Sequence, residues 1–432
     1  MASEWRELPF SQAVTVNPRV QLARRATYPF VEMGAVSAGS RSAYASEQRE
    51  FTGGGSRFAV GDTLMARITP CLENGKIARF AGQRGEIAHG STEFIVIRGR
   101  DGVSETDYAY YLTKWECVSG YAISHMTGTS GRQRVPSETF DHLNVPLPPL
   151  PEQRAIAHIL GTLDDKIEIL RRQSETLEAM ARALFKAWFV DFEPVRAKMG
   201  GRWRRGESLS GMPAELWERF PDRLVESELG EIPEGWEAGR LGDVAEHPRR
   251  SLQPDTIEPS LPYIALEHMP RRCISLFEWG VAEGLESNKF EFKKGDVLFG
   301  KLRPYFHKVG VAPIDGVCST DIVVMTARCP EWFGLVLSHA SSDEFVEYTN
   351  AGSTGTKMPR TSWTDMARYE IVLPPKFVAE AFTALTGPWI ERIIAAIHES
   401  RTLAQLRDTL LPKLISGELR VPNFTQQLEE MA

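Results

Sequence analysis

The 432-residue sequence is poor in cysteine and has no long run of apolar residues. No tract approaches the roughly 18 consecutive apolar residues that a membrane-spanning helix needs. The first residues, "MASEWRELPF", lack the basic and apolar regions of a signal peptide. We therefore expect a cytoplasmic protein with no membrane partner. The five cysteines form no CxxC pair, so free buried thiols are favoured over a disulfide framework or a zinc cluster; they are Cys71, Cys117, Cys273, Cys318 and Cys329.

Short motifs that carry cofactor and metal chemistry are also missing. The "NGK" at 74–76 has neither the upstream glycine nor the following Ser or Thr of a phosphate-binding loop, and no GxGxxG opens a helix after a strand. The histidines form no HxxxH or HExxH pattern, which gives a metal site no support. "LPPL" and "VLPP" lack the Asp or Asn that begins an adenine-methylating tetrapeptide. We expect a binding protein without a cofactor or metal of its own.

An enzyme whose motif departs from these patterns is the alternative. Asp255 followed by "EFK" at 291–293 superficially resembles a nuclease metal site. The internal repeat described below explains this region better, because Phe290 and Phe292 flank the turn that opens a repeated strand, where the first copy has "SRF".

The composition is that of an ordinary globular protein, with 42% hydrophobic and 25% charged residues. A chain of this length exceeds what one hydrophobic core usually holds, so two to four domains are expected. The net charge of −7 counts mildly against a chain that coats nucleic acid alone. It does not exclude local basic patches, since the distribution of Lys and Arg decides that.

The chain repeats itself. "GDTLMARITP" at 61–70 returns as "GDVLFGKLRP" at 295–304, and "STEFIVI" at 91–97 returns as "STDIVVM" at 319–325. "TGTSGRQRVP" at 127–136 resembles "AGSTGTKMPR" at 351–360. From Val145 the offset holds at 226 for 45 residues with ten identities, where chance gives about three. The protein is therefore predicted to be two copies of one unit, each a mixed α/β region followed by a long helix.

The repeated segments are predicted to be strands, and each has a cationic residue at the same position. "DTLMARI" and "DVLFGKL" have strand character, and Arg67 aligns with Lys301. Alternation puts Val297, Phe299, Lys301 and Arg303 on one face and Leu298 and Leu302 on the other. In the first copy Asn74-Gly75 predicts a type I′ hairpin turn. The aligned cations either contact DNA or are solvated charges near strand ends.

Each copy ends in a predicted helix with an apolar seam. The seam positions alternate in steps of four and three, as in a coiled coil, and so long an apolar stripe needs a partner, for which the other copy is the economical choice. Ser174 and Ser400 interrupt the seams in the same register, Arg407 breaks the second, and Pro388 and Pro412 should start, end or kink that helix. The seam positions are Ile156, Leu160, Leu163, Ile167, Leu170, Ser174, Leu177, Ala181, Leu184 and Trp188, then Phe382, Thr386, Trp389, Ile393, Ala396, Ser400, Leu403, Arg407, Leu410 and Leu414.

Residues 196–235 between the copies are polar and punctuated by Gly and Pro. We interpret them as a connector with a short helix around 213–219. The basic cluster of Arg202, Arg204 and Arg205 could touch DNA, although a solvated linker explains it better.

Three segments resemble a known family. "LPPLPEQRAIAHIL" from Leu147, "ESELGEIPEGW" at 226–236 and "LLPKLISGEL" at 410–419 are similar to the specificity subunits of type I restriction–modification systems. The resemblance covers essentially the whole chain. The first copy departs at its exit, "LFKAWFVDFEP", and the second at its start, "LPPKFVAEAF".

The resemblance implies a fold and a set of partners. The implied α+β fold has two tandem target-recognition domains separated by two long helices packed as an antiparallel coiled coil. Each domain reads one half of a bipartite asymmetric DNA target, and the helices set the spacer between the halves. Two methyltransferase subunits methylate adenine N6 using S-adenosylmethionine, and restriction subunits that use ATP and Mg join them. The domains expected are 1–150 and 236–375 for recognition, 151–195 and 376–420 for the helices, 196–235 for the connector, and 421–432 for the tail.

Position in the repeat nominates the DNA-reading residues. The aligned Gly/Ser/Thr loops before each last strand, together with basic strand and hairpin positions, offer the forked donors that base contacts need. Without DNA specificity the chain would be a non-catalytic two-headed scaffold, which is the second alternative. The nominated residues are Arg67, Lys76, Thr129, Ser130, Arg132, Gln133 and Arg134 in the first copy, and Lys301, Arg303, Lys308, Ser353, Thr354, Lys357 and Arg360 in the second.

Overall fold

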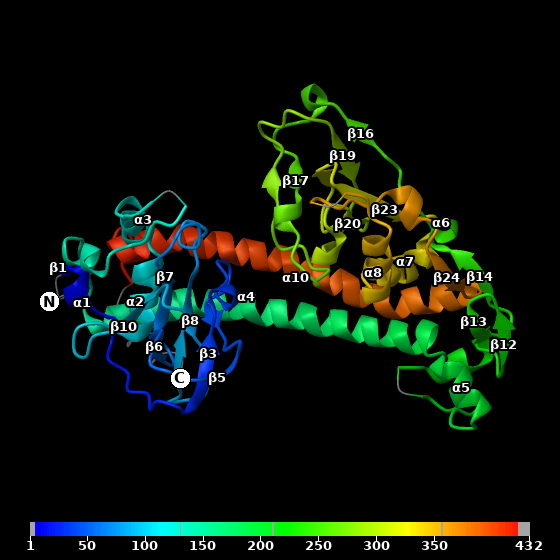
Figure 1. The fold of residues 1–432 in the computed structure, drawn as a ribbon, viewed down its shortest axis with the longest axis horizontal. Coiled ribbons are helices and arrows are strands. Elements are labelled where there is room, and N and C mark those ends of the chain that lie inside the picture. The colour runs from blue at the N-terminus through cyan, green and yellow to red at the C-terminus, as the bar shows by residue number, and fades with distance from the viewer. Residues whose placement is uncertain (1–4, 130, 210, 356, 422–432) are drawn as a thin grey trace. The chain divides into compact units, whose positions relative to one another are not determined.

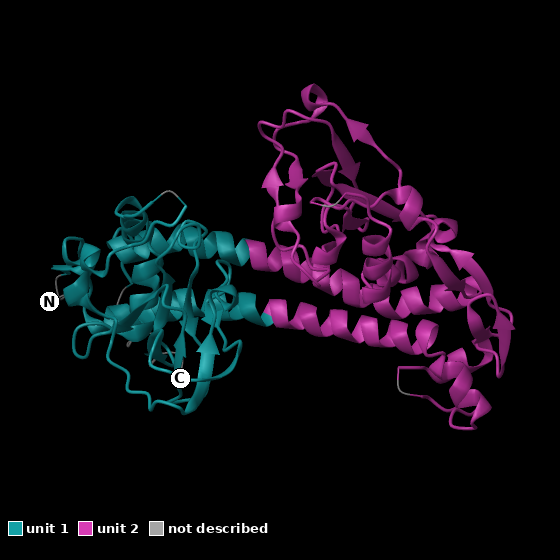
Figure 2. Ribbon diagram, viewed as in Figure 1, with its two compact units in different colours: residues 1–169, 402–432 teal, residues 170–401 magenta. Residues whose placement is uncertain are grey.

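The computed structural model describes residues 5–129, 131–209, 211–355 and 357–421 of a mixed α/β protein (Figure 1). The chain divides into two compact units (Figure 2). Unit 1 comprises residues 1–169 and 402–432, and unit 2 comprises residues 170–401. The long helices α4 (Leu150–Phe185) and α10 (Lys376–Ser416) each contribute to both units. Among the described residues, no helix is both long and apolar enough to cross a membrane.

Unit 1 is built on two sheets. The first has the order β2 (Val14–Val16), β10 (Phe94–Gly99), β7 (Thr63–Ala66), β8 (Ile77–Phe80), β4 (Ser42–Ala43). The second has the order β5 (Glu47–Glu50), β3 (Thr27–Val31), β9 (Ile87–Gly90), β6 (Ser56–Ala59). A ribbon of β1 (Arg6–Pro9) and β11 (Asn144–Leu147) precedes α4, and the unit's remaining α-helices are α1 (Phe10–Ala13), α2 (Thr106–Lys114) and α3 (Glu116–Ser124).

Unit 2 repeats this plan. Its sheets have the orders β15 (Ala245–Glu246), β23 (Ile322–Ala327), β20 (Val297–Gly300), β21 (Val309–Val311), and β16 (Ser251–Leu252), β19 (Lys289–Phe292), β22 (Gly316–Cys318), β17 (Pro262–Ile264), β18 (Gly280–Val281). The ribbon of β14 (Glu237–Arg240) and β24 (Glu370–Leu373) precedes α10. Helices α6 (Leu241–Val244), α7 (Phe333–Ala340), α8 (Asp343–Ala351) and α9 (Trp363–Met366) complete the repeated region.

The strands predicted from the repeated phrases are confirmed. β7 pairs antiparallel with β10, as β20 does with β23. Val297 and Phe299 enter one apolar cluster and Leu298 another, as alternation requires. The predicted type I′ turn is wrong, because Asn74 has no positive φ and the chain from 68 to 76 closes through helix-like hydrogen bonds such as Asn74 N–H to the Pro70 carbonyl (2.9 Å).

The helices pair inside each unit, with their predicted seam positions buried or half-buried. In unit 1 the start of α4 meets the end of α10, where Ile156 and Leu160 share a cluster with Leu414 and Ile415. In unit 2 the later part of α4 lies against the first part of α10, where Leu177 packs on the cluster that holds Ile393. Of the effects expected of the prolines, a start or an end of the helix is wrong, since α10 runs through Pro388 and Pro412.

Residues 185–209 and 211–236, which we call the aromatic module, are folded rather than a solvated linker. They contain α5 (Glu193–Met199), a 3-10 helix at Ala214–Arg219, and the hairpin of β12 (Leu224–Ser227) and β13 (Gly230–Pro233). Trp188 is fully buried, with its ring centroid 5.1 Å from that of Phe220 and 5.6 Å from that of Phe382. Burial of aromatic rings supplies the core that the polar composition of 196–235 conceals.

Candidate nucleic-acid interface

In unit 1 the end of β7 brings two predicted residues to one edge. Arg67 directly follows the strand, and its backbone N–H donates to the backbone carbonyl of Glu93 (2.9 Å). The loop that carries Arg134 returns to this point, because Ile68 and Arg134 form a β-bridge and the Val135 N–H donates to the Arg67 carbonyl (2.8 Å).

Unit 2 has the same arrangement after β20. The Lys301 N–H donates to the Asp321 carbonyl (2.9 Å), and the Thr361 N–H donates to the Lys301 carbonyl (3.1 Å). Leu302 and Arg360 form the bridge that corresponds to Ile68 and Arg134. Backbone hydrogen bonds thus fix the strand-end cation and the loop arginine as neighbours in both copies.

An acid that the sequence analysis missed holds each loop arginine. In unit 1, Nη2 and Nε of Arg134 donate to the Glu93 carboxylate (2.7 and 3.0 Å). In unit 2, Nε of Arg360 donates to Asp321 (3.2 Å). The hydrogen bond from Arg134 lowers the pKa of the Glu93 carboxyl, so Glu93 is charged at neutral pH.

A signal for these acids was visible in the sequence. Glu93 and Asp321 stand in the repeated "STEF" and "STDI" phrases, and their N–H groups donate to the hydroxyls of Ser91 (3.1 Å) and Ser319 (3.2 Å). The structure also corrects the loop alignment. Arg134 corresponds to Arg360, whereas the alignment of 127–136 with 351–360 placed Arg134 opposite Met358.

The loops themselves are closed at their bases and exposed at their tips. Thr127 and Arg134 exchange backbone hydrogen bonds (2.9 and 2.8 Å), as Thr354 and Arg360 do (3.0 and 2.9 Å). Exposed side chains at or near the tips are Thr129, Arg132 and Lys357. Gln133 is half-buried with its N–H on the Thr69 hydroxyl (3.1 Å), Ser353 Oγ donates to the Asn350 carbonyl (2.7 Å), and Ser130 lies outside the described residues.

Three other predicted cations are engaged by the fold. The ammonium of Lys76 donates to the Met33 carbonyl (2.9 Å), and that of Lys308 donates to the Leu266 carbonyl. Burial lowers the pKa of the Lys308 ammonium. Arg303 has a φ of +52°, and its N–H donates to the Pro359 carbonyl (2.7 Å). These contacts give structural roles to the side chains of Lys76 and Lys308 and to the backbone of Arg303.

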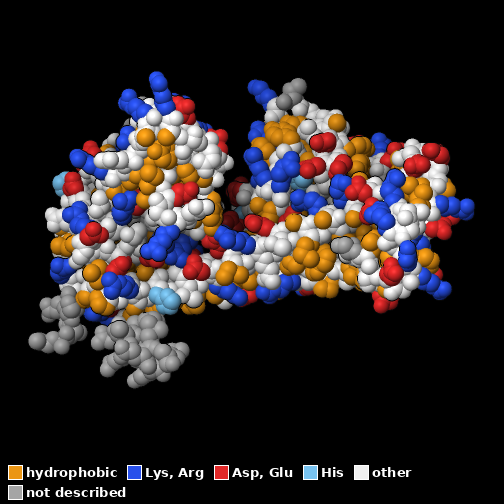
Figure 3. All heavy atoms as spheres, turned by 90° about the horizontal axis from the view of Figure 1, so that it is seen from below, with side chains coloured by type: hydrophobic (Ala, Val, Ile, Leu, Met, Phe, Trp, Pro, Cys, Tyr) orange, Lys and Arg blue, Asp and Glu red, His pale blue; other side chains and the backbone are white. Residues whose placement is uncertain are grey.

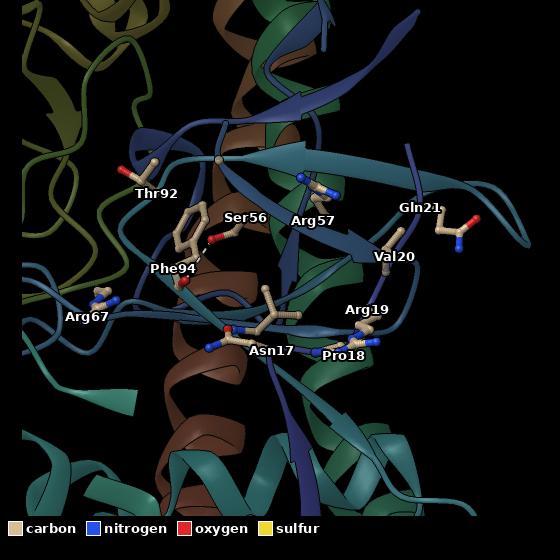
Figure 4. Close-up of a pocket in the computed structure, with 12 residues that line it drawn as sticks. Asn17, Pro18, Arg19, Val20, Gln21, Ser56, Arg57, Arg67, Thr92 and Phe94 are labelled. Atoms are coloured by element: carbon tan, nitrogen blue, oxygen red, sulfur yellow. Dashed lines mark hydrogen bonds between the residues drawn. The ribbon is translucent and has the colours of Figure 1, made fainter. Parts of the chain in front are cut away.

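Unit 1 also has a hollow beside Arg67, with a volume of about 600 Å³ (Figure 4). Arg19, Arg57 and Arg67 line it, and its lining contains no acidic side chain. Asn17 shapes one wall through a φ of +49° and a bond from the Val96 N–H to its side-chain oxygen (3.0 Å). A concave cationic surface with amide groups suits a phosphate backbone. Arg19 and Arg57 belong to no motif, so sequence reasoning had no signal for them.

Charges of both signs are interspersed on the face shown in Figure 3. This distribution agrees with the negative net charge and leaves the hollow and the loops as local cationic features. Within the described part of the chain, no group of three or more His, Cys, Asp or Glu could hold a metal ion.

Comparisons with known proteins agree with these features. Residues 19–179 match the family model of the type I restriction modification DNA specificity domain. The chain is 28% identical over 336 residues to the MjaIX specificity subunit of Methanocaldococcus jannaschii. The aligned region covers 74% of this chain and 71% of that relative. It is 26% identical over 376 residues to the HindI specificity subunit of Haemophilus influenzae, covering 76% and 81%. A crystal structure of a type I restriction–modification S subunit from M. genitalium has a similar fold, with a TM-score of 0.50, 12% identity, and coverage of 95% and 96%.

Proposed function

We propose that the chain is a specificity subunit of a type I restriction–modification system, that it reads a bipartite asymmetric DNA target, and that it is not itself an enzyme. Unit 1 reads one half of the target and unit 2 reads the other. The observation that carries this proposal is the repeated constellation of strand-end cation, acid and loop arginine, at Arg67, Glu93 and Arg134 and again at Lys301, Asp321 and Arg360.

The constellation suits base reading because it fixes a forked donor at the rim of a loop. An arginine held by a carboxylate keeps outward-facing N–H groups in a defined direction, which favours a bidentate contact with a base edge. The exposed Arg132 and Lys357 and the cationic hollow then supply sequence-independent phosphate contacts.

In this proposal the helices α4 and α10 form an antiparallel coiled-coil spacer between two recognition domains. Joining two weak readers makes the second contact intramolecular, which raises the affinity for DNA that carries both half-sites. The chain works with two methyltransferase subunits that methylate adenine N6 using S-adenosylmethionine and with restriction subunits that use ATP and Mg. The cytoplasm is the compartment proposed for this complex.

Salt-dependent DNA binding by the chain co-purified with its methyltransferase subunit tests this function. We expect the logarithm of the association constant for duplex DNA to fall with the logarithm of salt concentration, by about 0.9 per phosphate contact. Arg57→Ala with Arg67→Ala should make this slope shallower by about two contacts. The matched control is Arg202→Ala with Arg205→Ala, whose guanidinium groups pair with Glu193 and Glu218 in the aromatic module, and it should leave the slope unchanged.

Two results would contradict the proposal. If the complex is soluble but binds no DNA, or if its affinity for its partner does not change with salt concentration, the chain would instead be a two-headed scaffold without DNA specificity. Binding of S-adenosylmethionine by this chain alone in equilibrium dialysis would instead favour an enzyme.

A further inference from the structure

One ion pair is buried between the two helices of unit 1. Nη1 of Arg407 in α10 donates to Oδ1 of Asp164 in α4 over 2.6 Å. The Arg407 side chain is 10% exposed and that of Asp164 is 3% exposed. The prediction that Arg407 breaks the seam is therefore wrong, because its charged side chain lies in the seam and pairs there with Asp164.

The recognition domain of unit 1 joins the same pair. The phenol of Tyr111, in α2, donates to Oδ2 of Asp164 over 2.8 Å. Burial raises the pKa of Tyr111, so the phenol keeps the proton that it donates. Nε of Arg407 donates to Asp408 (2.9 Å). One carboxylate thus ties together the domain, α4 and α10.

A second bond connects the domain with α4 close by. Nη1 of Arg41, which precedes β4, donates to Asp165 (2.6 Å), and its guanidinium lies 5.9 Å from the centre of the Tyr111 ring. The orientation of the domain on α4 is therefore defined by directional polar contacts as well as by apolar packing.

The repeat shows that the fold of such a unit does not need this ion pair. At the offset of 226, Asp164 corresponds to Ile390 and Arg407 corresponds to Ala181, and both of these are buried in unit 2. A buried ion pair commonly adds no stability over apolar residues of similar volume. Its best-established use in paired helices is to select one register.

We propose that Asp164, Arg407 and Tyr111 are positioning residues that fix the register and orientation of the first recognition domain on the helix pair, and so the number of base pairs between the two half-sites. This inference rests on the proposed function. A slip of one heptad moves a helix by about 10 Å, the length of roughly three base pairs. In a slipped register Arg407 would face Ala157 or Arg171, seven residues from Asp164, and would lose its partner.

The test is the spacer preference of methylation. The chain is co-expressed with its methyltransferase subunit in a host without adenine methylation, on plasmids whose half-sites are separated by about one to three base pairs more or fewer than the natural spacer. Wild type should prefer its own spacer by about a hundredfold, because a misplacement near 1 Å can cost that much. The variant Asp164→Leu, Arg407→Leu, Tyr111→Phe should reduce this preference to less than about tenfold while both half-sites stay unchanged.

The corresponding position in unit 2 provides the control. Ile390→Val should leave the spacer preference at the wild-type value. If the triple variant unfolds cooperatively and methylates DNA with an unchanged preference, the inference is wrong. If the triple variant fails to fold, Asp164→Asn decides, since it keeps the shape and the acceptor oxygen but removes the charge, and an unchanged preference would overturn the inference. Wild type that methylates no bipartite site would refute the proposed function, and the inference with it.

Discussion

At the scale of single residues, Glu93 and Asp321 connect the two predicted cations of each copy. The backbone carbonyl of each acid accepts a hydrogen bond from the backbone N–H of the strand-end residue, and its carboxylate accepts one from the loop arginine. Surface ion pairs contribute little to stability, so their value here is directional. The loop arginines were predictable because base reading favours that side chain. The acids stand in a repeated phrase but were not predicted, because their role appears only when the loop arginine folds back onto them.

The two acids give a prediction in which each half of the target is the control for the other. Glu93→Gln should relax the base preference only in the half-site read by unit 1, and Asp321→Asn only in the other half. A lost bidentate contact reduces discrimination by about 1–3 kcal/mol. Sequencing of N6-methyladenine in DNA methylated by each variant complex measures this. If each variant alters both halves, or neither variant alters any, the assignment of these loops is wrong.

His339 in α7 gives a prediction about pH. Its ring is 4.8 Å from that of Phe185, and its Nε2 has no hydrogen-bond partner among the described residues. Burial lowers the pKa of His339 to about 3, below the value near 6.5 of the unfolded chain. The unfolded state therefore binds more protons as pH falls below about 6.5, and the free energy of unfolding should fall by up to about 1.4 kcal/mol per pH unit.

Urea unfolding of wild type and His339→Leu at pH 7 and pH 5 measures this loss. The Leu variant should lose less of its unfolding free energy between the two pH values than wild type does. His142→Asn, at an exposed position, is the control and should behave as wild type. Equal losses in wild type and His339→Leu would show that His339 is not held neutral by burial.

At the scale of elements, the aromatic module differs most from what its composition indicates, because a polar segment that was expected to be a linker contains a buried aromatic core. Trp188 continues the seam of α4 into a cluster with Phe220 and Phe382. Replacing a buried aromatic side chain by alanine costs about 3–5 kcal/mol, so Trp188→Ala should reduce the unfolding free energy by that amount. Phe377→Ala, where the side chain is 44% exposed, should cost less than about 1 kcal/mol. If urea unfolding gave similar losses of unfolding free energy for the two variants, the module would not have the packed aromatic core described above.

Elements with a strong period could be predicted from the sequence, and elements closed by tertiary contacts could not. β7 and β20 follow from alternation and the long helices from the seam. The Asn74-Gly75 turn failed because the Pro70 carbonyl and its neighbours provide local helix-like bonds that a dipeptide rule ignores. α10 continues through Pro388 because packing of its buried face outweighs one lost hydrogen bond.

At the scale of the whole molecule, the internal repeat made the duplicated plan predictable. It did not predict the differences between the copies, which lie in single substitutions such as Asp164 for Ile390 and Arg407 for Ala181. The seam pattern alone indicated that Arg407 interrupts the apolar stripe, since its partner Asp164 is 243 residues away in the sequence. The cationic hollow was equally hidden, because Arg19, Arg57 and Arg67 meet only in the folded unit.

The central claim is that the two copies read two halves of one DNA target. The most direct measurement is the N6-methyladenine profile of genomic DNA from a host without adenine methylation that expresses this chain with its methyltransferase subunit. We predict one split sequence with a fixed spacer and a methylated adenine in each half. A continuous methylated sequence, or no methylation despite a soluble complex of the two proteins, would contradict the claim.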